Sequence, residues 1–162
     1  MPKIIVSDTS PLFYLHRVGC LELLRRLYGN IIVPQAVIAE LEEGREQGED
    51  VPDIDKYQWI KVQHITVPLH IKLIPDLGKG ESEVLSMGLC EEQHLIIIDD
   101  KLAREIARLQ NLRFTGTAGI LLKSKKKKYL TEIKPVLCQL EQAGFFLRKD
   151  LIVNILQLAD EM

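Results

Sequence analysis

The sequence predicts an α/β protein, a three-layer α/β/α sandwich with a mainly parallel central sheet. Short aliphatic runs alternate with segments of helical periodicity along the whole chain, which is the pattern of strands connected by covering helices. The segment His94–Ile98 has four consecutive aliphatic residues with no polar alternation, which is typical of a central parallel strand. A length of 162 residues fits one compact domain, so we expect residues 1–162 to form a single domain.

Each expected strand is a short, mostly aliphatic run that ends at polar or turn-forming residues. The five segments are Lys3–Ser7, Ile31–Val33, Trp59–Val62, His94–Ile98 and Leu112–Phe114. Helices are expected between them, where apolar residues recur at helical spacing and Pro or a small hydroxyl residue starts the segment. They comprise two helices joined near Gly19-Cys20, one that starts at Pro34 and ends at Gly44, one after Gly80, Leu102–Leu109, one from Thr117, Ile133–Ala143 and Leu151–Leu158.

The composition excludes several classes of protein. No apolar stretch approaches the roughly 20 residues of a membrane-spanning helix, and the N-terminal residues lack a signal-peptide pattern, so we expect a cytoplasmic protein. Three cysteines without a C-x-x-C spacing predict neither a disulfide framework nor a zinc site. The four histidines share no ligand spacing, and we assign them no catalytic role.

The charge is unevenly distributed along the chain. A net charge of −2 argues against nucleic-acid binding by bulk electrostatics, so any such contact must be local. One basic run stands out and has two readings, a solvated surface turn or a patch that steers nucleic-acid phosphates. It consists of Lys125, Lys126, Lys127 and Lys128, with Lys123 just before it. No aromatic residues are interleaved with this run, so its sequence does not indicate base stacking.

Acidic residues follow two of the expected strands directly. Asp8 ends the first strand and the pair Asp99-Asp100 ends the fourth, and ligands of open α/β sheets gather at the carboxyl ends of strands. Glu40 and Glu81 lie on helices that could pack beside these strands. Four carboxylates in one cleft repel one another unless a hard cation is bound, and Mg²⁺ or Mn²⁺ suits oxygen ligands and phosphate substrates. The pattern therefore indicates metal-assisted phosphodiester hydrolysis.

Each acid also has a purely structural reading when it is taken alone. Asp8 could cap a helix, Glu40 could be a solvated helix residue, and Glu81 or Glu83 could favour the positive end of a helix dipole. Asp99-Asp100 is less easily explained in this way, because one carboxylate can cap the next helix while the other stays free. The combined pattern carries the prediction.

Four segments in order resemble the PIN domain, and the closest likeness is to its VapC-like branch of toxin–antitoxin systems. They are Ile4–Leu12, Ile32–Leu41, Gly80–Val84 and Leu95–Asp100, and Phe114–Leu121 resembles a later helix start of that branch. The resemblance implies a ribonuclease dependent on Mg²⁺ or Mn²⁺, with Asp8, Glu40, Glu81 and Asp100 at the family's acidic positions. It places Asp99 and Glu83 as second-tier ligands and the hydroxyl residues Thr9, Ser10 and Thr117 near the metals, where they could equally cap helices.

The resemblance also implies partners. RNA is the expected substrate, an antitoxin protein is a candidate partner, and apolar helical faces at Leu12–Leu27 and Leu151–Leu158 favour a homodimer.

Three other functions remain open. The first is a catalytically weak PIN-like domain that binds nucleic acid or protein, and metal affinity separates it from the nuclease. The second is a nuclease for DNA, which the lack of a long helical arch or clamp insertion disfavours. The third is a phosphotransfer receiver domain, which requires its acidic pair after the first strand, whereas here the pair follows a late strand.

Overall fold

The structure, a computed structural model, describes residues 1–162 and contains one five-stranded sheet in which every pairing is parallel. The strand order is β3-β2-β1-β4-β5. The strands are β1 (Ile4–Ser7), β2 (Ile31–Pro34), β3 (Ile60–Gln63), β4 (His94–Ile97) and β5 (Phe114–Thr115). This sheet confirms the expected α/β/α fold.

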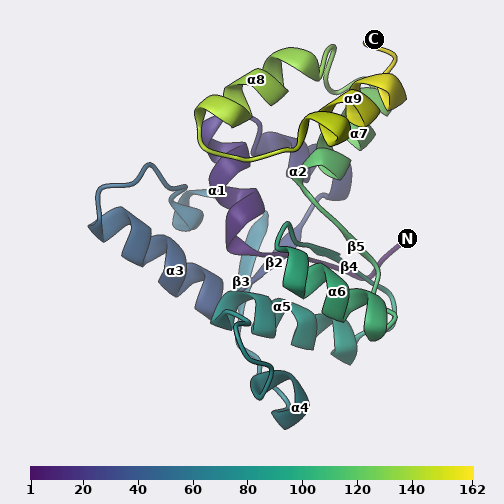
Figure 1. Ribbon diagram of the computed structural model, residues 1–162. Coiled ribbons are helices and arrows are strands. Elements are labelled where there is room, and N and C mark those ends of the chain that lie inside the picture. The colour runs from purple at the N-terminus through teal and green to yellow at the C-terminus, as the bar shows by residue number, and fades with distance from the viewer.

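Helices cover both faces of the sheet, as Figure 1 shows. Helices α5 and α6 lie on one side, while α1, α2 and α7 lie on the other, with α8 and α9 outside them. Helix α3 contacts both α1 and α5. The bounds are α1 (Thr9–Arg17), α2 (Glu22–Tyr28), α3 (Gln35–Glu46), α4 (Leu69–Lys72), α5 (Lys79–Cys90), α6 (Lys101–Leu109), α7 (Thr117–Lys126), α8 (Lys134–Gln142) and α9 (Lys149–Leu158), with a 3-10 turn at Ile54–Lys56.

The central strands β1 and β4 are paired along their whole length. Ile4 is opposite His94 and Ser7 is opposite Ile97, so both strands end at the same level. Val6, Ile96 and Ile97 are fully buried between the two helical layers, which explains why these strands lack polar alternation. They belong to a core of 33 buried apolar residues. The pairing of β1 with β4 thus brings the residues that follow these two strands to the same edge of the sheet.

Two expectations about helices need correction. Gly44 does not end α3, which continues to Glu46. The glycine that terminates it is Gly48, which adopts φ +85° and donates its N–H to the carbonyl of Arg45. A left-handed residue just beyond the last turn costs glycine little, so Gly48 is the better stop signal. The short helix α4 was not expected from the sequence.

None of the helices is both long and apolar enough to cross a membrane. Cys20, Cys90 and Cys138 are all free thiols.

Candidate active site

The chain reverses its direction of travel across the sheet between β1 and β4. From β1 it proceeds to β2 on one side, and from β4 it proceeds to β5 on the other. Between two such strands the outgoing connections separate, which leaves a crevice at their carboxyl ends. Asp8 follows β1 and Asp99 follows β4, so both acids lie at this crevice.

Asp8 is the most deeply buried acid of the site. Only 1% of its surface is exposed, and its Oδ1 has no hydrogen-bond partner. Burial raises the pKa of Asp8 well above its ordinary value, and the neighbouring charges of Glu81 and Glu40 raise it further. A buried carboxylate oxygen without a donor makes the ionised form costly, and the carboxyl of Glu81 can hydrogen-bond to Asp8 only when one of the two is protonated.

Glu40 is held beside Asp8 by α1 and α5. Its Oε2 accepts a hydrogen bond from the hydroxyl of Thr9, and its Oε1 accepts one of 3.0 Å from the N–H of Gly80. A Cβ on Gly80 would lie 2.7 Å from Oε1 of Glu40 and 3.0 Å from Oδ1 of Asp8. The two carboxylates therefore converge on the surface of α5 at a place that only a glycine leaves open.

Glu81 follows Gly80 and completes this group. Gly80 and Glu81 both lie in the first turn of α5, which begins at Lys79 and thus slightly before the start expected after Gly80. Burial raises the pKa of Glu81, and the charges of Glu40 and Asp100 add to the rise. Glu81 thus interacts with Asp8, Glu40 and Asp100, and its side chain is half-buried.

Asp99 and Asp100 take different roles although they are adjacent. Asp99 is held by three donors, because Oδ1 accepts from the N–H of Thr117 at 2.8 Å and Oδ2 accepts from the hydroxyls of Thr117 at 2.7 Å and Ser10 at 3.3 Å. Burial raises the pKa of Asp99, although these bonds and the charge of Arg104 oppose the rise. Asp99 therefore anchors the start of α7 to the crevice.

Asp100 is exposed and begins α6. Its Oδ2 accepts a hydrogen bond of 2.9 Å from the N–H of Ala103, which is the bond of a helix N-cap. It also lines, with Glu81 and Asp99, a cavity of about 650 Å³ at the mouth of the crevice. Its other carboxylate oxygen makes no hydrogen bond, and its charge acts on Glu81, so Asp100 combines a capping role with a place in the acidic group.

The side chain of Glu83 makes a contact within the fold instead of pointing to the other acids. Its Oε1 accepts a hydrogen bond of 3.1 Å from the N–H of Ala36, in the first turn of α3. It therefore joins α5 to α3, and Glu81 is the acid of the pair that faces Asp8. His94 is likewise used in the fold, since Nδ1 bonds the carbonyl of Glu91 and Nε2 accepts from the N–H of Arg113.

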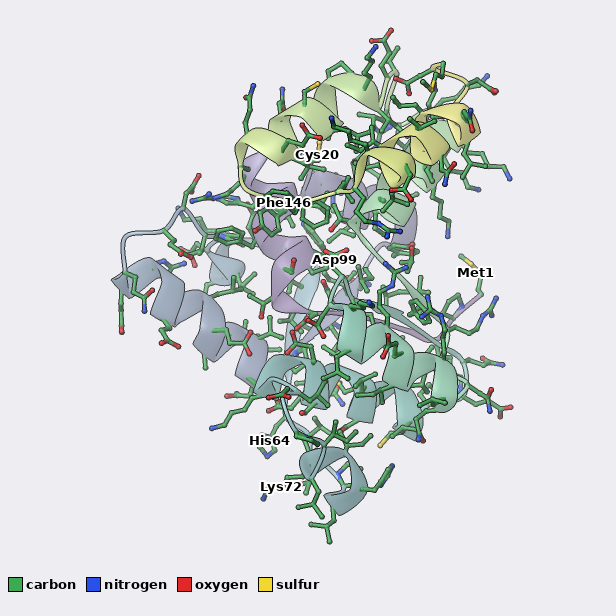
Figure 2. The ribbon with its side chains drawn as sticks, in the orientation of Figure 1. Met1, Cys20, His64, Lys72, Asp99 and Phe146 are labelled. Carbon is green, nitrogen blue, oxygen red and sulfur yellow. The ribbon has the colours of Figure 1, made fainter.

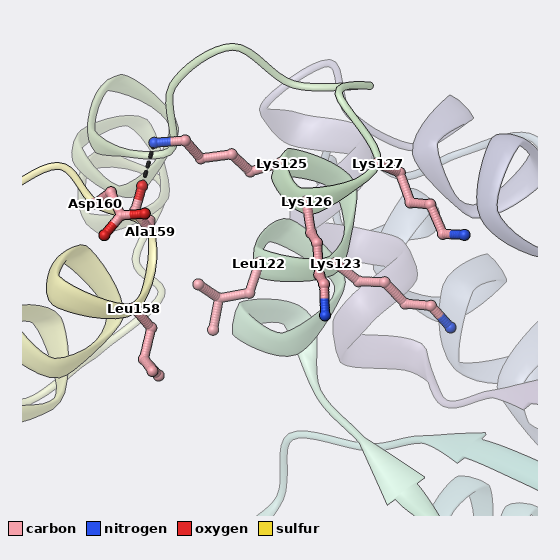
Figure 3. Close-up of a pocket in the computed structure, with 8 residues that line it drawn as sticks. All are labelled: Leu122, Lys123, Lys125, Lys126, Lys127, Leu158, Ala159 and Asp160. Atoms are coloured by element: carbon pink, nitrogen blue, oxygen red, sulfur yellow. Dashed lines mark hydrogen bonds between the residues drawn. The ribbon is translucent and has the colours of Figure 1, made fainter.

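The lysine run lies at the opposite end of α7 from Thr117. Lys125 is only 24% exposed, because its ammonium group donates to the carbonyl of Ala159 and to Glu161 Oε2. Figure 3 shows Lys125 directed toward the C-terminal residues, while Lys123, Lys126 and Lys127 are directed away from them. Together with Leu122 and Leu158 these lysines line a hollow of about 980 Å³ that includes none of the acids of the crevice. Lys126, Lys127 and Lys128 are exposed, and their contact with RNA stays a prediction.

The acids do not form a ready-made cage for a metal ion. No group of three or more His, Cys, Asp or Glu side chains is close enough to hold one. The residues nevertheless fit a divalent ion of the Mg²⁺ type. Asp8 Oδ1 is buried and has no hydrogen-bond partner, and the missing side chain of Gly80 leaves space next to Asp8 and Glu40. Every candidate ligand is a carboxylate oxygen, the type of ligand that Mg²⁺ prefers.

The fold and the site define a class of protein, an all-parallel α/β/α sandwich with an acidic crevice at its topological switch point. A family model described as PIN domain matches residues 4–161, and the chain belongs to this family. PIN domains are generally nucleases that use divalent metal ions. No curated protein and no solved structure matches the chain.

The role of Gly80 is the main feature that reasoning from the sequence missed. From the sequence, Glu81 is assigned to the acidic group, but Gly80 has no role beyond preceding a helix. The signal that could have revealed it is a glycine inside the first helical turn next to an acid, since a helix interior disfavours glycine unless a close contact requires it.

Proposed function

We propose that this protein is a metal-dependent endoribonuclease. The observation that carries the proposal is the buried, unpartnered Oδ1 of Asp8, next to Glu40 at a surface where Gly80 leaves space. We infer that Asp8, Glu40, Glu81 and Asp100 hold Mg²⁺ or Mn²⁺. When bound, such an ion lowers the pKa of an attacking water and stabilises negative charge on the leaving oxygen.

Hydrogen bonds within the chain orient the carboxylates that we propose as metal ligands. Thr9 and the N–H of Gly80 orient both oxygens of Glu40, and the N–H of Ala103 orients one oxygen of Asp100. Asp99, held by Ser10 and Thr117, fixes the end of β4 from which Asp100 projects. The pKa values of Asp8 and Glu81 are both raised, so ionisation of these acids is costly unless a cation compensates their charges.

The decisive experiment is cleavage of a labelled single-stranded RNA in the presence of Mn²⁺. Asp8→Asn, Glu40→Gln and Asp100→Asn should each lower the rate by about a hundredfold or more, because each removes a charge that holds the ion. Asp99→Asn should lower it less, because the amide oxygen can still accept from the N–H of Thr117 and the NH2 group can donate to the hydroxyl oxygens of Thr117 and Ser10. Equal cleavage by wild type and by an identically purified Asp8→Asn protein would identify a contaminating nuclease and remove the proposal.

A specific observation favours a second function, a PIN-like domain that binds nucleic acid or protein without cleaving it. The absence of three close ligands is what an inactive site would also present. Titration calorimetry with Mg²⁺ and Mn²⁺ decides between the two functions. No binding at millimolar ion concentration, together with a melting temperature indifferent to the ions, would favour the binding module.

We further propose that the chain is the toxin of a VapC-like toxin–antitoxin pair and forms a homodimer. The resemblance of the acidic segments to that branch supports the first statement, and an adjacent gene for a small DNA-binding protein would test it. The exposed Leu151 and Leu158 on α9 support the second. Sedimentation that shows only monomer at tens of micromolar protein would contradict the dimer.

A further inference from the structure

Arg104 is the one basic residue that lines the cavity of about 650 Å³ beside the acids. It projects from α6, one turn after Asp100, and its guanidinium group forms no ion pair and no side-chain hydrogen bond. Its Nε is buried and lacks a partner. The guanidinium lies over the ring of Phe114, 5.1 Å from the centroid, and its charge acts on Asp99. The side chain is thus held in place, while no side-chain hydrogen bond occupies its terminal N–H groups.

Phe146 lines the same cavity from the other side. It lies in the connection between α8 and α9, and 97% of its surface is exposed. Its neighbours Phe145 and Leu147 pack against the core, so the connection is anchored on both sides of the exposed ring. Figure 2 shows Phe146 on the segment that crosses from α8 to α9, with Asp99 below it near the ends of the strands. A large aromatic side chain that is exposed to solvent next to a polar site presents a flat face on which a ligand can stack.

The ligand must therefore offer two features at once, a planar group for Phe146 and an anionic acceptor for Arg104. A nucleotide of a single strand has both, since every base has a flat face and every phosphate accepts the charged hydrogen bonds of arginine. A duplex has its bases stacked and does not offer a free face. We propose that this cavity is a nucleotide subsite, in which Phe146 stacks on a base and Arg104 binds a phosphate next to the one that is cleaved.

This inference rests on the proposed function and specifies it as recognition of single-stranded RNA. It also changes the position of the main phosphate contact. The lysine run lines a different hollow at the far end of α7, whereas Arg104 lines the same cavity as Glu81, Asp99 and Asp100. A cation at this place can orient a backbone that the surrounding carboxylates would otherwise repel.

The experiment measures binding of a fluorescein-labelled single-stranded RNA to the full chain in EDTA at low ionic strength, by anisotropy. Without divalent ions the result does not depend on cleavage. Phe146→Leu keeps an apolar side chain and removes the ring, and it should weaken binding about fivefold or more, while Phe146→Trp should restore it. Arg104→Gln should weaken binding about tenfold and reduce the slope of log K against log salt by about 0.7, the value for one phosphate contact of a single strand.

The chain offers a matched control for Arg104. Arg108 lies one turn further along α6, 5.3 Å from the centroid of the same Phe114 ring, but does not line the cavity. Arg108→Gln removes the same charge from the same helix and should leave both affinity and salt slope close to wild type. A slope lowered equally by Arg104→Gln and Arg108→Gln would mean a general charge effect and would overturn the subsite.

The outcomes separate this inference from the proposed function. If wild type binds RNA through Phe146 and Arg104 but does not cleave it with Mn²⁺, the subsite stands and the nuclease fails. If wild type cleaves RNA while Phe146→Leu and Arg104→Gln bind and cleave normally, the subsite fails and the nuclease stands. With a working nuclease, both variants should raise KM more than they lower kcat.

Discussion

Replacing Gly80 with alanine should separate activity from stability. Gly80 lies in the first turn of α5, where its N–H donates to Glu40. The added Cβ would lie 2.7 Å from Oε1 of Glu40, whereas ordinary contacts begin at 3.4 Å, so the carboxylate must move by about 0.7 Å. The same atom would approach Oδ1 of Asp8 to 3.0 Å. Both proposed metal ligands are thus displaced by one methyl group.

The expected loss in cleavage rate is about tenfold to a hundredfold. Displacements near 1 Å in a positioned catalytic group cost about a hundredfold, and altered contacts around metal ligands cost about tenfold to a hundredfold. The folded state should not suffer comparably, because alanine is up to about 1 kcal/mol more favourable than glycine in a helix. Gly80→Ala should therefore melt close to wild type while it cleaves poorly.

Gly88→Ala is the matched control in the same helix. Its Cβ would meet its nearest neighbours, Ile96 and Leu112, at 3.4 Å, and it lies away from every acid of the crevice. It gains the same helix propensity and should keep the wild-type rate. Cleavage of labelled RNA with Mn²⁺ and thermal melting of all three proteins provide the test. A Gly80→Ala protein that is folded and cleaves at the wild-type rate would refute the role assigned to the meeting point of Asp8 and Glu40.

Three further predictions concern charge and stability. In EDTA, Asp8→Asn should melt higher than wild type at neutral pH, because the raised pKa makes ionisation of Asp8 costly in the folded state. This difference in melting temperature should vanish as the pH falls toward 3.8, the ordinary pKa of an aspartate. An equal difference at all pH values would contradict the prediction. Mg²⁺ should then raise the melting temperature of wild type more than that of Asp8→Asn, which differential scanning fluorimetry measures. Glu161→Gln should destabilise the fold by about 1–3 kcal/mol in urea titrations, because Glu161 accepts from the N–H groups of Ile133 and Lys134 and from Lys125. Burial alone would raise the pKa of Glu161, but these donors lower it. The contribution of Glu161 to folding stability should therefore be present above pH 4.5 and be lost as the pH falls through the lowered pKa. A Glu161→Gln effect that persists in acid would argue against the ionic contact.

The positions where the strands end could be predicted from the sequence, because they depend on local patterns. A β-branched run such as Ile4–Val6 stops at its first polar residues, and a parallel sheet brings the carboxyl ends of its strands to one edge. Asp8 and Asp99-Asp100 were therefore recognisable as neighbours before any tertiary contact was known.

The direction of each side chain was decided only by tertiary contacts. Asp99 and Asp100 are adjacent in the chain, yet one turns inward to Ser10 and Thr117 while the other caps α6. Glu81 and Glu83 differ in the same way, since only Glu83 reaches the N–H of Ala36. The two members of each pair have the same residue type, so local patterns alone could not rank them, and the order predicted from the sequence depends on the resemblance to the PIN domain.

The sequence by itself determined the fold class, the alternation of strands and helices, and the edge of the sheet where the acids gather, because these follow from the periodicity of neighbouring residues. Only the tertiary structure decided that Lys125 is bound to Glu161, that Gly80 must remain small, and that Phe146 and Arg104 share a cavity with the acids. Each of these features joins residues that are distant in the chain. Their positions depend on how whole helices pack against the sheet, and no short stretch of sequence encodes that packing.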